Sequence, residues 1–440
     1  MNKVKGFQEA KQILFNNRSF DTFSYSISPG DFSVDLFGTK MTLNDYISRI
    51  ISEVRQRGDE AIFEFVEKIE GNKINNISVP LSEAERAYRS INSELRESLE
   101  IASNRIKHFQ ERSLPENWKD EKEGYGQNFL PVTSAGAYIP GGTACYPSTV
   151  LMTAIPAKVA GVRDFSIASP ALNTGLPHPS VLAAAYIAGV DNIYTVGGPH
   201  AIAALAFGTE SVLPVDVICG PGNVFVTMAK KLVYGQVGID GLYGPTETLI
   251  IADSFANPVT CALDLLAQAE HDVNAFPVFI TTSQELSDEV EKQLTIRLSQ
   301  MQRSEIAMQS ILNNGINAVV DSLEEAMALS NGFAPEHLSL AVKDPERLIS
   351  KVTNAGMVFT GEFSHEVLGD YGAGPSHVMP TAGTARFNGG LGVFTFLKPM
   401  PVVSLSKKDA LSITSHAVAI AREEGLHGHA DAAEIRRELS

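Results

Sequence analysis

The sequence predicts an α/β protein built from two doubly wound lobes with mostly parallel sheets. Short apolar runs alternate with helical patterns from Pro131 to about Gly241, and a second block of the same kind follows. Glycine-rich breaks come after several of these runs, as expected where a strand turns into a helix. At 440 residues the chain is too long for one ordinary core, so two lobes with smaller appendages are expected.

The N-terminal third is predicted to be mainly helical. Residues 1–30 are polar, with a short helical pattern at 7–15, and are expected to form an arm. From Met41 to about Gln110 the chain is charged, and apolar residues such as Leu43 and Ile47 recur at helical spacing.

In the first α/β block, each apolar run of strand length precedes a helical pattern. The expected strands are 136–139, 165–168, 193–196 and 215–219, and the expected helices are 149–161, 180–188, 200–207 and 224–233. Glycine-rich loops follow Ile139, Val196 and Cys219. Together they form one wall of a crevice suited to phosphate, although a tight turn explains any single loop equally well. The G-x-G-x-x-G fingerprint is absent, so an ordinary dinucleotide fold is not indicated.

The second block has five expected strands and three helical signals. The strands are 248–252, 278–281, 318–320, 338–342 and 357–360. Asn257 and Pro258 are typical of a helix start, and that helix ends near His271. Ser322 and Glu325 have capping-box spacing, with Asn331-Gly332 as the expected end. A C-terminal helix is expected from about Lys408, with a break at Gly425.

Composition excludes several classes of partner. The 51 acidic residues against 35 basic ones give a formal charge of -16, which argues against nucleic acid and anionic membranes. The three cysteines have no paired spacing, so a disulfide framework is not expected and a reducing cytoplasm fits. The N-terminus has no signal-peptide pattern, and no apolar run is long enough to span a membrane.

Four segments carry residue types suited to chemistry. Gln268 and His271 share one helical face and can supply half of a metal site, although a helical histidine is more often a satisfied core or surface residue. Glu336-His337 offers two adjacent bases of different strength, or else an incidental polar loop. Asp370 lies in a glycine-rich loop, where it equally suits a turn.

The fourth segment is near the C-terminus. Glu424 and His429 flank the Gly425 break, where a solvated helix is the plain alternative and His427 is an equal rival to His429. A cysteine nucleophile is not indicated, because no cysteine has a sequence neighbour that would lower its pKa.

Taken in order, these segments resemble the histidinol dehydrogenase family, whose members catalyse the last step of histidine biosynthesis. The matching segments are Tyr138-Ile139-Pro140-Gly141-Gly142, 201–211, Gly220-Pro221-Gly222-Asn223, Gln268-Ala269-Glu270-His271, Ala334-Pro335-Glu336-His337-Leu338, Gly369-Asp370-Tyr371, His377-Val378-Met379-Pro380-Thr381 and 424–429. Each motif is moderately specific; their order and spacing make the set strong, and the similarity begins at about residue 40.

The resemblance implies two incomplete Rossmann-like lobes of aldehyde-dehydrogenase type with small helical appendages at both ends. It implies an N-terminal arm at 1–30, a first lobe of 31–131 plus 247–380 with the zinc and catalytic residues, and an NAD-binding lobe at 132–246. The tail, 381–440, would reach the partner subunit of a homodimer that shares its active sites.

The resemblance also assigns roles. Zinc would be held by Gln268, His271, Asp370 and His429, and would position the substrate through its imidazole and amino nitrogens. His337 would accept the alcohol proton and Glu336 would activate water on the bound aldehyde, with two NAD reduced for each L-histidinol oxidised to L-histidine. Thr246, His377 and Glu424 would contact the substrate, beside His337 and the four metal ligands. The NAD contacts would be Tyr138, His200 and Asn223.

Two positions depart from the family pattern. Thr246 stands where serine is usual, which keeps the hydroxyl. His200 stands where the family has a glutamine that helps to bind NAD, which puts its cofactor role in question. Two other hypotheses remain. One is a related zinc- and NAD-dependent enzyme for another polar alcohol, such as a sulfonated diol; the other is a binding or regulatory protein that kept the fold without catalysis.

Overall fold

The computed structural model describes residues 1–15, 30–141 and 145–438. The remainder of the expected arm, 16–29, lies outside the described residues, and so does Gly142 of the first glycine-rich loop. The chain folds into two compact units, one of residues 1–113 and 133–396 and the other of residues 114–132 and 397–440.

The first unit contains two six-stranded sheets, which confirms the doubly wound prediction. One sheet has the order β1-β12-β11-β10-β13-β14, and all its neighbours are parallel. Its strands are β1 (Asn2–Lys5), β10 (Glu247–Ala252), β11 (Phe276–Thr281), β12 (Ile316–Val319), β13 (His337–Ala341) and β14 (Met357–Thr360). Every residue of β10 is buried, as expected for an inner strand covered on both faces.

The other sheet has the order β2-β7-β6-β5-β8-β9. Its strands are β2 (Ser78–Val79), β5 (Ser134–Tyr138), β6 (Asp164–Ser169), β7 (Asn192–Thr195), β8 (Val217–Cys219) and β9 (Gly238–Ile239). All pairs are parallel except β2 with β7. The chain runs from β5 through β6 to β7 on one side and from β8 to β9 on the other. The order therefore reverses between β5 and β8, where open α/β sheets bind ligands.

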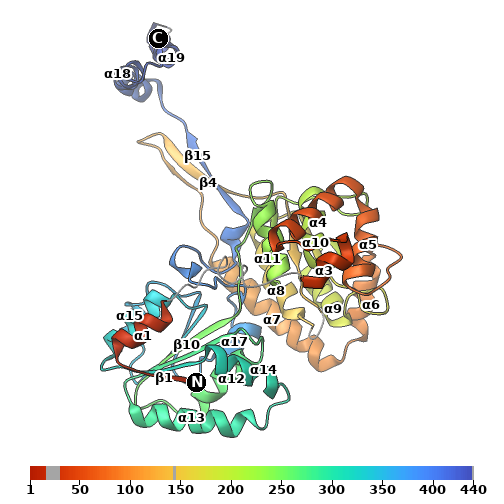
Figure 1. The fold of residues 1–440 in the computed structure, drawn as a ribbon. Helices are drawn as coiled ribbons and strands as arrows, with labels where there is room; N and C mark the ends of the chain where they lie inside the picture. Colours follow the sequence, from red (N-terminus) through yellow and green to blue (C-terminus); the bar gives the residue numbers. More distant parts are fainter. Residues whose placement is uncertain (16–29, 142–144, 439–440) are drawn as a thin grey trace. The chain divides into compact units, whose positions relative to one another are not determined.

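Helices of the first unit cover both sheets (Figure 1). They are α1 (Phe7–Leu14), α3 (Gly30–Phe37), α4 (Leu43–Arg57), α5 (Asp59–Ile69), α6 (Leu81–Ser90), α7 (Ser93–Arg112), α8 (Pro147–Ala160), α9 (Pro179–Ala188), α10 (Gly198–Phe207), α11 (Val224–Val233), α12 (Pro258–Ala269), α13 (Gln284–Leu298), α14 (Ser304–Asn314), α15 (Leu323–Phe333), α16 (Glu346–Ile349) and α17 (Glu366–Tyr371). The alanine-rich α10 is almost wholly buried, because its small side chains let it pack closely on several sides.

Two expected domain assignments were wrong. Residues 2–14 do not form a separate arm, since β1 extends the β10 sheet and Val4, Ala10 and Leu14 are buried in its core. Residues 31–131 do not join the 247–380 lobe. Side chains of α4 and α5 belong to the core of the β5 sheet, β2 pairs with β7, and residues 114–131 fall in the second unit.

The sequence predicted the first residues of these helices more accurately than their last residues. Asn257 caps α12 and Ser322 caps α15 through side-chain oxygens, as predicted. The expected stop of α15 at Asn331-Gly332 was wrong, because the helix continues to Phe333 and ends on Ala334 in the left-handed conformation, with φ 53°. Packing of the buried Phe333 against the β10 core explains why the glycine does not end it.

The second unit has an antiparallel sheet and two helices. The sheet has the order β15 (Leu397–Val403), β4 (Tyr125–Pro131) and β3 (Trp118–Asp120). The helices are α18 (Lys407–Glu423) and α19 (His427–Glu438), and the predicted break is confirmed by Gly425 with φ 73°. Among the described residues, no helix is both long enough and apolar enough to cross a membrane.

Candidate active site

Glu336 and His337 lie where the chain enters the central part of the β10 sheet. The left-handed Ala334 and the following Pro335 turn the chain out of α15, and β13 begins at His337 between β10 and β14. The side chains of Glu336 and His337 are almost completely buried. The segment that the sequence predicted to be a polar loop is therefore the beginning of an inner strand. This position holds the Glu336 and His337 side chains on a rigid element.

The Glu336 carboxylate is held on one oxygen and desolvated. Its Oε2 accepts hydrogen bonds from the Thr246 hydroxyl at 2.7 Å and from the Glu247 backbone N–H at 3.0 Å. Burial raises the pKa of Glu336 to about 7, against the opposing effects of the His337 charge and these two hydrogen bonds. A carboxyl group with such a pKa is suited to accept a proton near neutral pH.

The His337 imidazole has one hydrogen-bonded nitrogen and one that approaches a carboxylate without a hydrogen bond. Its Nδ1 lies 3.1 Å from the Glu247 carbonyl oxygen, to which it donates, and the ring stacks on Phe359. Its Nε2 is buried without a hydrogen-bond partner among the described residues and lies 3.6 Å from Asp370 Oδ1. Burial acts to lower the pKa of His337, but the surrounding carboxylates, Glu336 first, raise it above its usual value.

Gln268 contributes an amide beside the same carboxylate. It is buried near the end of α12, and Thr246 Oγ1 lies 3.0 Å from its Oε1. A hydroxyl has one proton, and the carboxylate of Glu336 is the stronger acceptor for it. Turning the amide over would let its NH₂ donate to Thr246 and leave its oxygen free for a cation.

His271 and Asp370 complete this side of the site. His271 follows the C-cap of α12 and Asp370 lies near the end of the short helix α17, not in the loop that the sequence predicted. Desolvation lowers the pKa of His271, with Asp370 opposing. His271 is nonetheless exposed, and it is one of the residues that line a cavity. Burial acts to raise the pKa of Asp370, but His337 outweighs it and the net pKa is lowered. A neutral imidazole and an ionised carboxylate both offer lone pairs to a metal.

His377 is held by the protein through both ring nitrogens. Its Nδ1 lies 2.8 Å from the Asp370 carbonyl oxygen, and its Nε2 lies 3.1 Å from the Thr149 hydroxyl at the start of α8. Burial lowers the pKa of His377. The neutral ring therefore ties the Asp370 segment to α8, a link that the sequence did not suggest for Thr149.

These side chains surround a cavity of about 460 Å³. The predicted residues that line it are Asn223, Thr246, Gln268, His271, Glu336, His337, Asp370 and His377. Glu424 and His429 belong to the second unit, where both are exposed. Over the described residues, no group of three or more His, Cys, Asp or Glu side chains forms a ready metal site.

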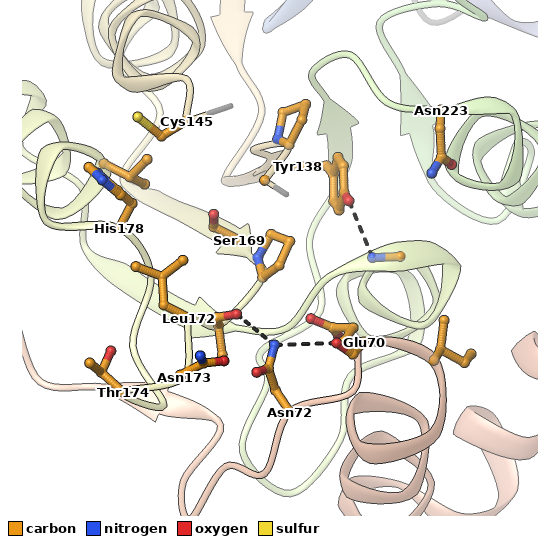
Figure 2. A pocket seen from close by; sticks show the side chains of 17 residues that line it. Glu70, Asn72, Tyr138, Cys145, Ser169, Leu172, Asn173, Thr174, His178 and Asn223 are labelled. Carbon is orange, nitrogen blue, oxygen red and sulfur yellow. Dashed lines mark hydrogen bonds between the residues drawn. The ribbon is translucent and has the colours of Figure 1, made fainter. Parts of the chain in front are cut away.

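A second cavity, of about 970 Å³, lies at the carboxyl ends of β5 and β6 (Figure 2). Tyr138 and Asn223, two of the predicted cofactor contacts, line it, and Asn223 and Pro140 line both cavities. Asn223 Oδ1 caps α11, which leaves its NH₂ group for a ligand. The prediction for His200 was wrong: the ring is fully buried, and its Nε2 lies 2.8 Å from Glu70 Oε1.

Glycine at position 220 keeps the two strand ends together. Gly220 has φ 100°, and a Cβ added there would lie 2.3 Å from the Tyr138 carbonyl oxygen. Behind it, the buried Lys230 donates to the Gly220 carbonyl at 3.0 Å and pairs with Asp240. The glycine-rich loops of β5 and β8 therefore approach each other closely, which brings Tyr138 and Asn223 to one cavity.

Sequence reasoning missed a buried carboxylate behind His337. Glu366 Oε1 accepts hydrogen bonds from Thr248 on β10 and, at 3.1 Å, from Ser339 on β13. Burial raises the pKa of Glu366 to about 7. Its spacing of four residues from Asp370, which suggests one helical face, is the signal that could have revealed it.

Comparisons with known proteins agree on one family. The family model described as histidinol dehydrogenase matches residues 38–437. A histidinol dehydrogenase from Thermus thermophilus is 48% identical over 398 residues, covering 90% of this chain and 95% of the relative. One from Dehalococcoides mccartyi is 47% identical over 397 residues, covering 89% and 90%. The crystal structure of histidinol dehydrogenase from Elizabethkingia anophelis has a TM-score of 0.91 at 32% identity, covering 100% of this chain and 98% of that one.

Proposed function

This chain belongs to the histidinol dehydrogenase family, and on that premise we propose that it oxidises L-histidinol to L-histidine in the cavity that contains Glu336 and His337. The observation that carries the proposal is the adjacent pair of buried bases, one imidazole and one carboxylate, facing a cavity lined by Gln268, His271 and Asp370.

The overall reaction removes four electrons in two steps. The alcohol loses a proton and a hydride to give the aldehyde, and water then adds to the aldehyde. The hydrate loses a proton and a second hydride to give the carboxylic acid, which ionises. When bound, NAD accepts the hydride of each step, so that two NADH form for each histidinol. The protein must supply a proton acceptor for the alcohol and another for the water.

His337 fits the acceptor for the alcohol. Its Nε2 is buried and has no hydrogen-bond partner in the described part of the chain, while the Nδ1 bond to the Glu247 carbonyl fixes the ring. Accepting a proton requires the neutral imidazole, whereas neighbouring carboxylates raise the pKa of His337. A cation held on Asp370 would offset the negative charge of that carboxylate. It would therefore lower the pKa of His337 and favour the neutral imidazole, which can accept a proton.

Glu336 fits the acceptor for water. Its raised pKa, about 7, makes the carboxylate a stronger base than an exposed glutamate. The hydrogen bonds from Thr246 and Glu247 both reach Oε2, which leaves Oε1 to face a water molecule. The threonine at position 246 supplies the hydroxyl that the family pattern usually takes from serine.

The donor set fits zinc. The Gln268 oxygen, the His271 imidazole and the Asp370 carboxylate line one cavity, and His429 would be the fourth ligand. Nitrogen and oxygen donors in a four-ligand site are usual for zinc, although glutamine is a rare member. Zinc held by these residues would anchor the substrate as a Lewis acid, and the substrate's alcohol carbon would then lie near His337.

We propose that the fourth ligand comes from the tail of a partner subunit, in a homodimer in which Glu424 and His429 of each chain enter the other chain's site. The second unit exposes many large apolar side chains, as a subunit interface would. They are Leu114, Trp118, Tyr125, Leu130, Met400, Val402, Val403, Ile413, Ile420, Leu426 and Ile435. The three free cysteines suit a reducing cytoplasm.

Metal content and reaction stoichiometry test the proposed reaction. The purified enzyme should hold one zinc per chain and form two NADH for each L-histidinol consumed, with L-histidine as product. Mass spectrometry of the metal, absorbance of NADH and chromatography of the product measure these quantities. A sulfonated diol serves as the control substrate. Turnover of the diol with none of histidinol would replace histidinol as the substrate, and no turnover of either would favour a binding protein.

Mixing two inactive variants tests the shared site. His429→Ala and Glu336→Gln homodimers should each form almost no L-histidine in steady-state turnover, but a hybrid dimer combines both defects in one site and leaves the other intact. Random exchange of subunits should restore about a quarter of wild-type activity. The control mixes each variant with itself under the same exchange conditions. If the mixture stays inactive after mass spectrometry has shown hybrid dimers, the tail serves its own chain.

A further inference from the structure

The larger cavity contains a buried carboxylate to which the reaction assigns no role. Glu70 is the C-cap of α5, and only 9% of its side chain is exposed. It nevertheless lines the 970 Å³ cavity, with Asn72 beside it (Figure 2). Burying a carboxylate costs free energy unless its oxygens accept hydrogen bonds. The groups around Glu70 therefore indicate what kind of ligand group would complete its hydrogen bonding.

One oxygen of Glu70 is fixed and the other is not. Oε1 lies 2.9 Å from the Gly197 backbone N–H, which donates to it, and 2.8 Å from His200 Nε2. Oε2 is itself buried, and it has no hydrogen-bond partner in the described part of the chain. The His200 ring, in edge contact with Phe65, cannot turn away without disturbing the core. The carboxylate is therefore oriented by the protein and keeps one acceptor unused.

The same carboxylate occupies a helix end that would otherwise attract phosphate. Gly197 is the N-cap of α10, and no side chain of the helix caps it. Glu70 places its negative charge there instead, on an N–H of that helix end. A second anion at this point would be repelled. The part of a ligand next to Glu70 must therefore be neutral and able to donate a hydrogen bond.

The arrangement of the cavities indicates which part of the cofactor this is. Pro140 and Asn223 line both cavities, so a dinucleotide that reaches from the larger cavity to Glu336 and His337 would pass these two residues with its reacting end first. Glu70 and Asn72 line only the larger cavity. The portion of the dinucleotide farthest from the reacting ring is the adenosine, whose ribose carries two hydroxyl donors.

We propose that Glu70 makes this enzyme selective for NAD over the 2′-phosphorylated dinucleotide. Its free oxygen accepts a hydrogen bond from a hydroxyl of the adenosine ribose, and its charge repels a 2′-phosphate. The proposal rests on the cofactor site proposed above. Acidic residues have the same effect on the ribose in ordinary dinucleotide folds, but here the acid comes from a helix that precedes the sheet in the sequence.

Binding of two small nucleotides to the full-length zinc enzyme tests the proposal. Calorimetry compares 5′-AMP with adenosine 2′,5′-bisphosphate, which differ only in the 2′-phosphate. The wild type should prefer 5′-AMP, and Glu70→Gln should reduce that preference at least about tenfold, mainly through tighter binding of the bisphosphate. Glu67→Gln is the matched control, because Glu67 lies on the same helix, pairs with Lys73 and does not line the cavity. It should leave the preference unchanged.

The wild-type measurement keeps the proposal testable even if Glu70→Gln does not fold. Equal binding of the two nucleotides to the wild type would overturn it, and so would an unchanged preference in a folded Glu70→Gln variant. In either case, NADH formation from histidinol would show that the proposed reaction still stands. Failure of the wild type to bind NAD or form NADH would instead overturn both proposals.

Discussion

Glu336→Gln should slow the oxidation of aldehyde to acid by about 10²–10⁴-fold, the usual contribution of a general base. Glutamine has nearly the same shape and can keep an oxygen toward Thr246 and the Glu247 N–H, but it cannot accept a proton from water. Single-turnover reactions started from histidinol and from histidinaldehyde separate the two steps. The first step should continue, so that one NADH forms quickly and the second slowly.

The matched control is Glu111→Gln, because Glu111 is an exposed glutamate on α7. It should react as the wild type does. If Glu336→Gln releases two NADH at the wild-type rate, another group activates the water. A loss of zinc in Glu336→Gln would point to a structural role, so metal content must be measured on the same sample.

The pH profile of the wild type follows from the same residue. Glu336 acts as a base only as the carboxylate, and burial raises its pKa to about 7. The rate of aldehyde oxidation should therefore rise as pH increases through about 7 and level off above it. Below the pKa the group is protonated and the rate falls. A rate that is flat from pH 5 to 9 in single turnovers would contradict this assignment.

His337→Asn should lower the rate of the first hydride transfer, from the alcohol, by about 10²–10⁴-fold, because the alcohol proton loses its acceptor. The asparagine NH₂ can replace Nδ1 as the donor to the Glu247 carbonyl, but nothing replaces Nε2. Single-turnover NADH formation with deuterated histidinol measures the chemical step directly. His108→Asn, at an exposed position on α7, is the control and should be silent.

Zinc content distinguishes a lost base from a damaged site. His337 lies 3.6 Å from Asp370 but is not one of the proposed metal ligands. The variant should therefore retain zinc and bind histidinol while its chemistry is slow. Full activity of His337→Asn would remove His337 from the mechanism.

Local patterns in the sequence were enough to predict most of the parallel strands and most of the helices that cover both sheets. Apolar runs of strand length and helical spacing are properties of neighbouring residues, so β10, β13 and α12 could be placed without knowing their partners. The same patterns failed for β1, whose four residues, Asn-Lys-Val-Lys, have one apolar side chain. It is a strand only because the edge of β12 is available to it.

The sequence by itself determined which chemical groups this protein has: the adjacent Glu336-His337, the amide and imidazole on α12, and the glycine that lets two loops approach. Only the tertiary structure decided which of them meet. It buried His200 against Glu70, 130 positions away, and joined His377 to Thr149, 228 positions away. Such contacts depend on how whole elements pack, and no neighbouring residue in the sequence records them.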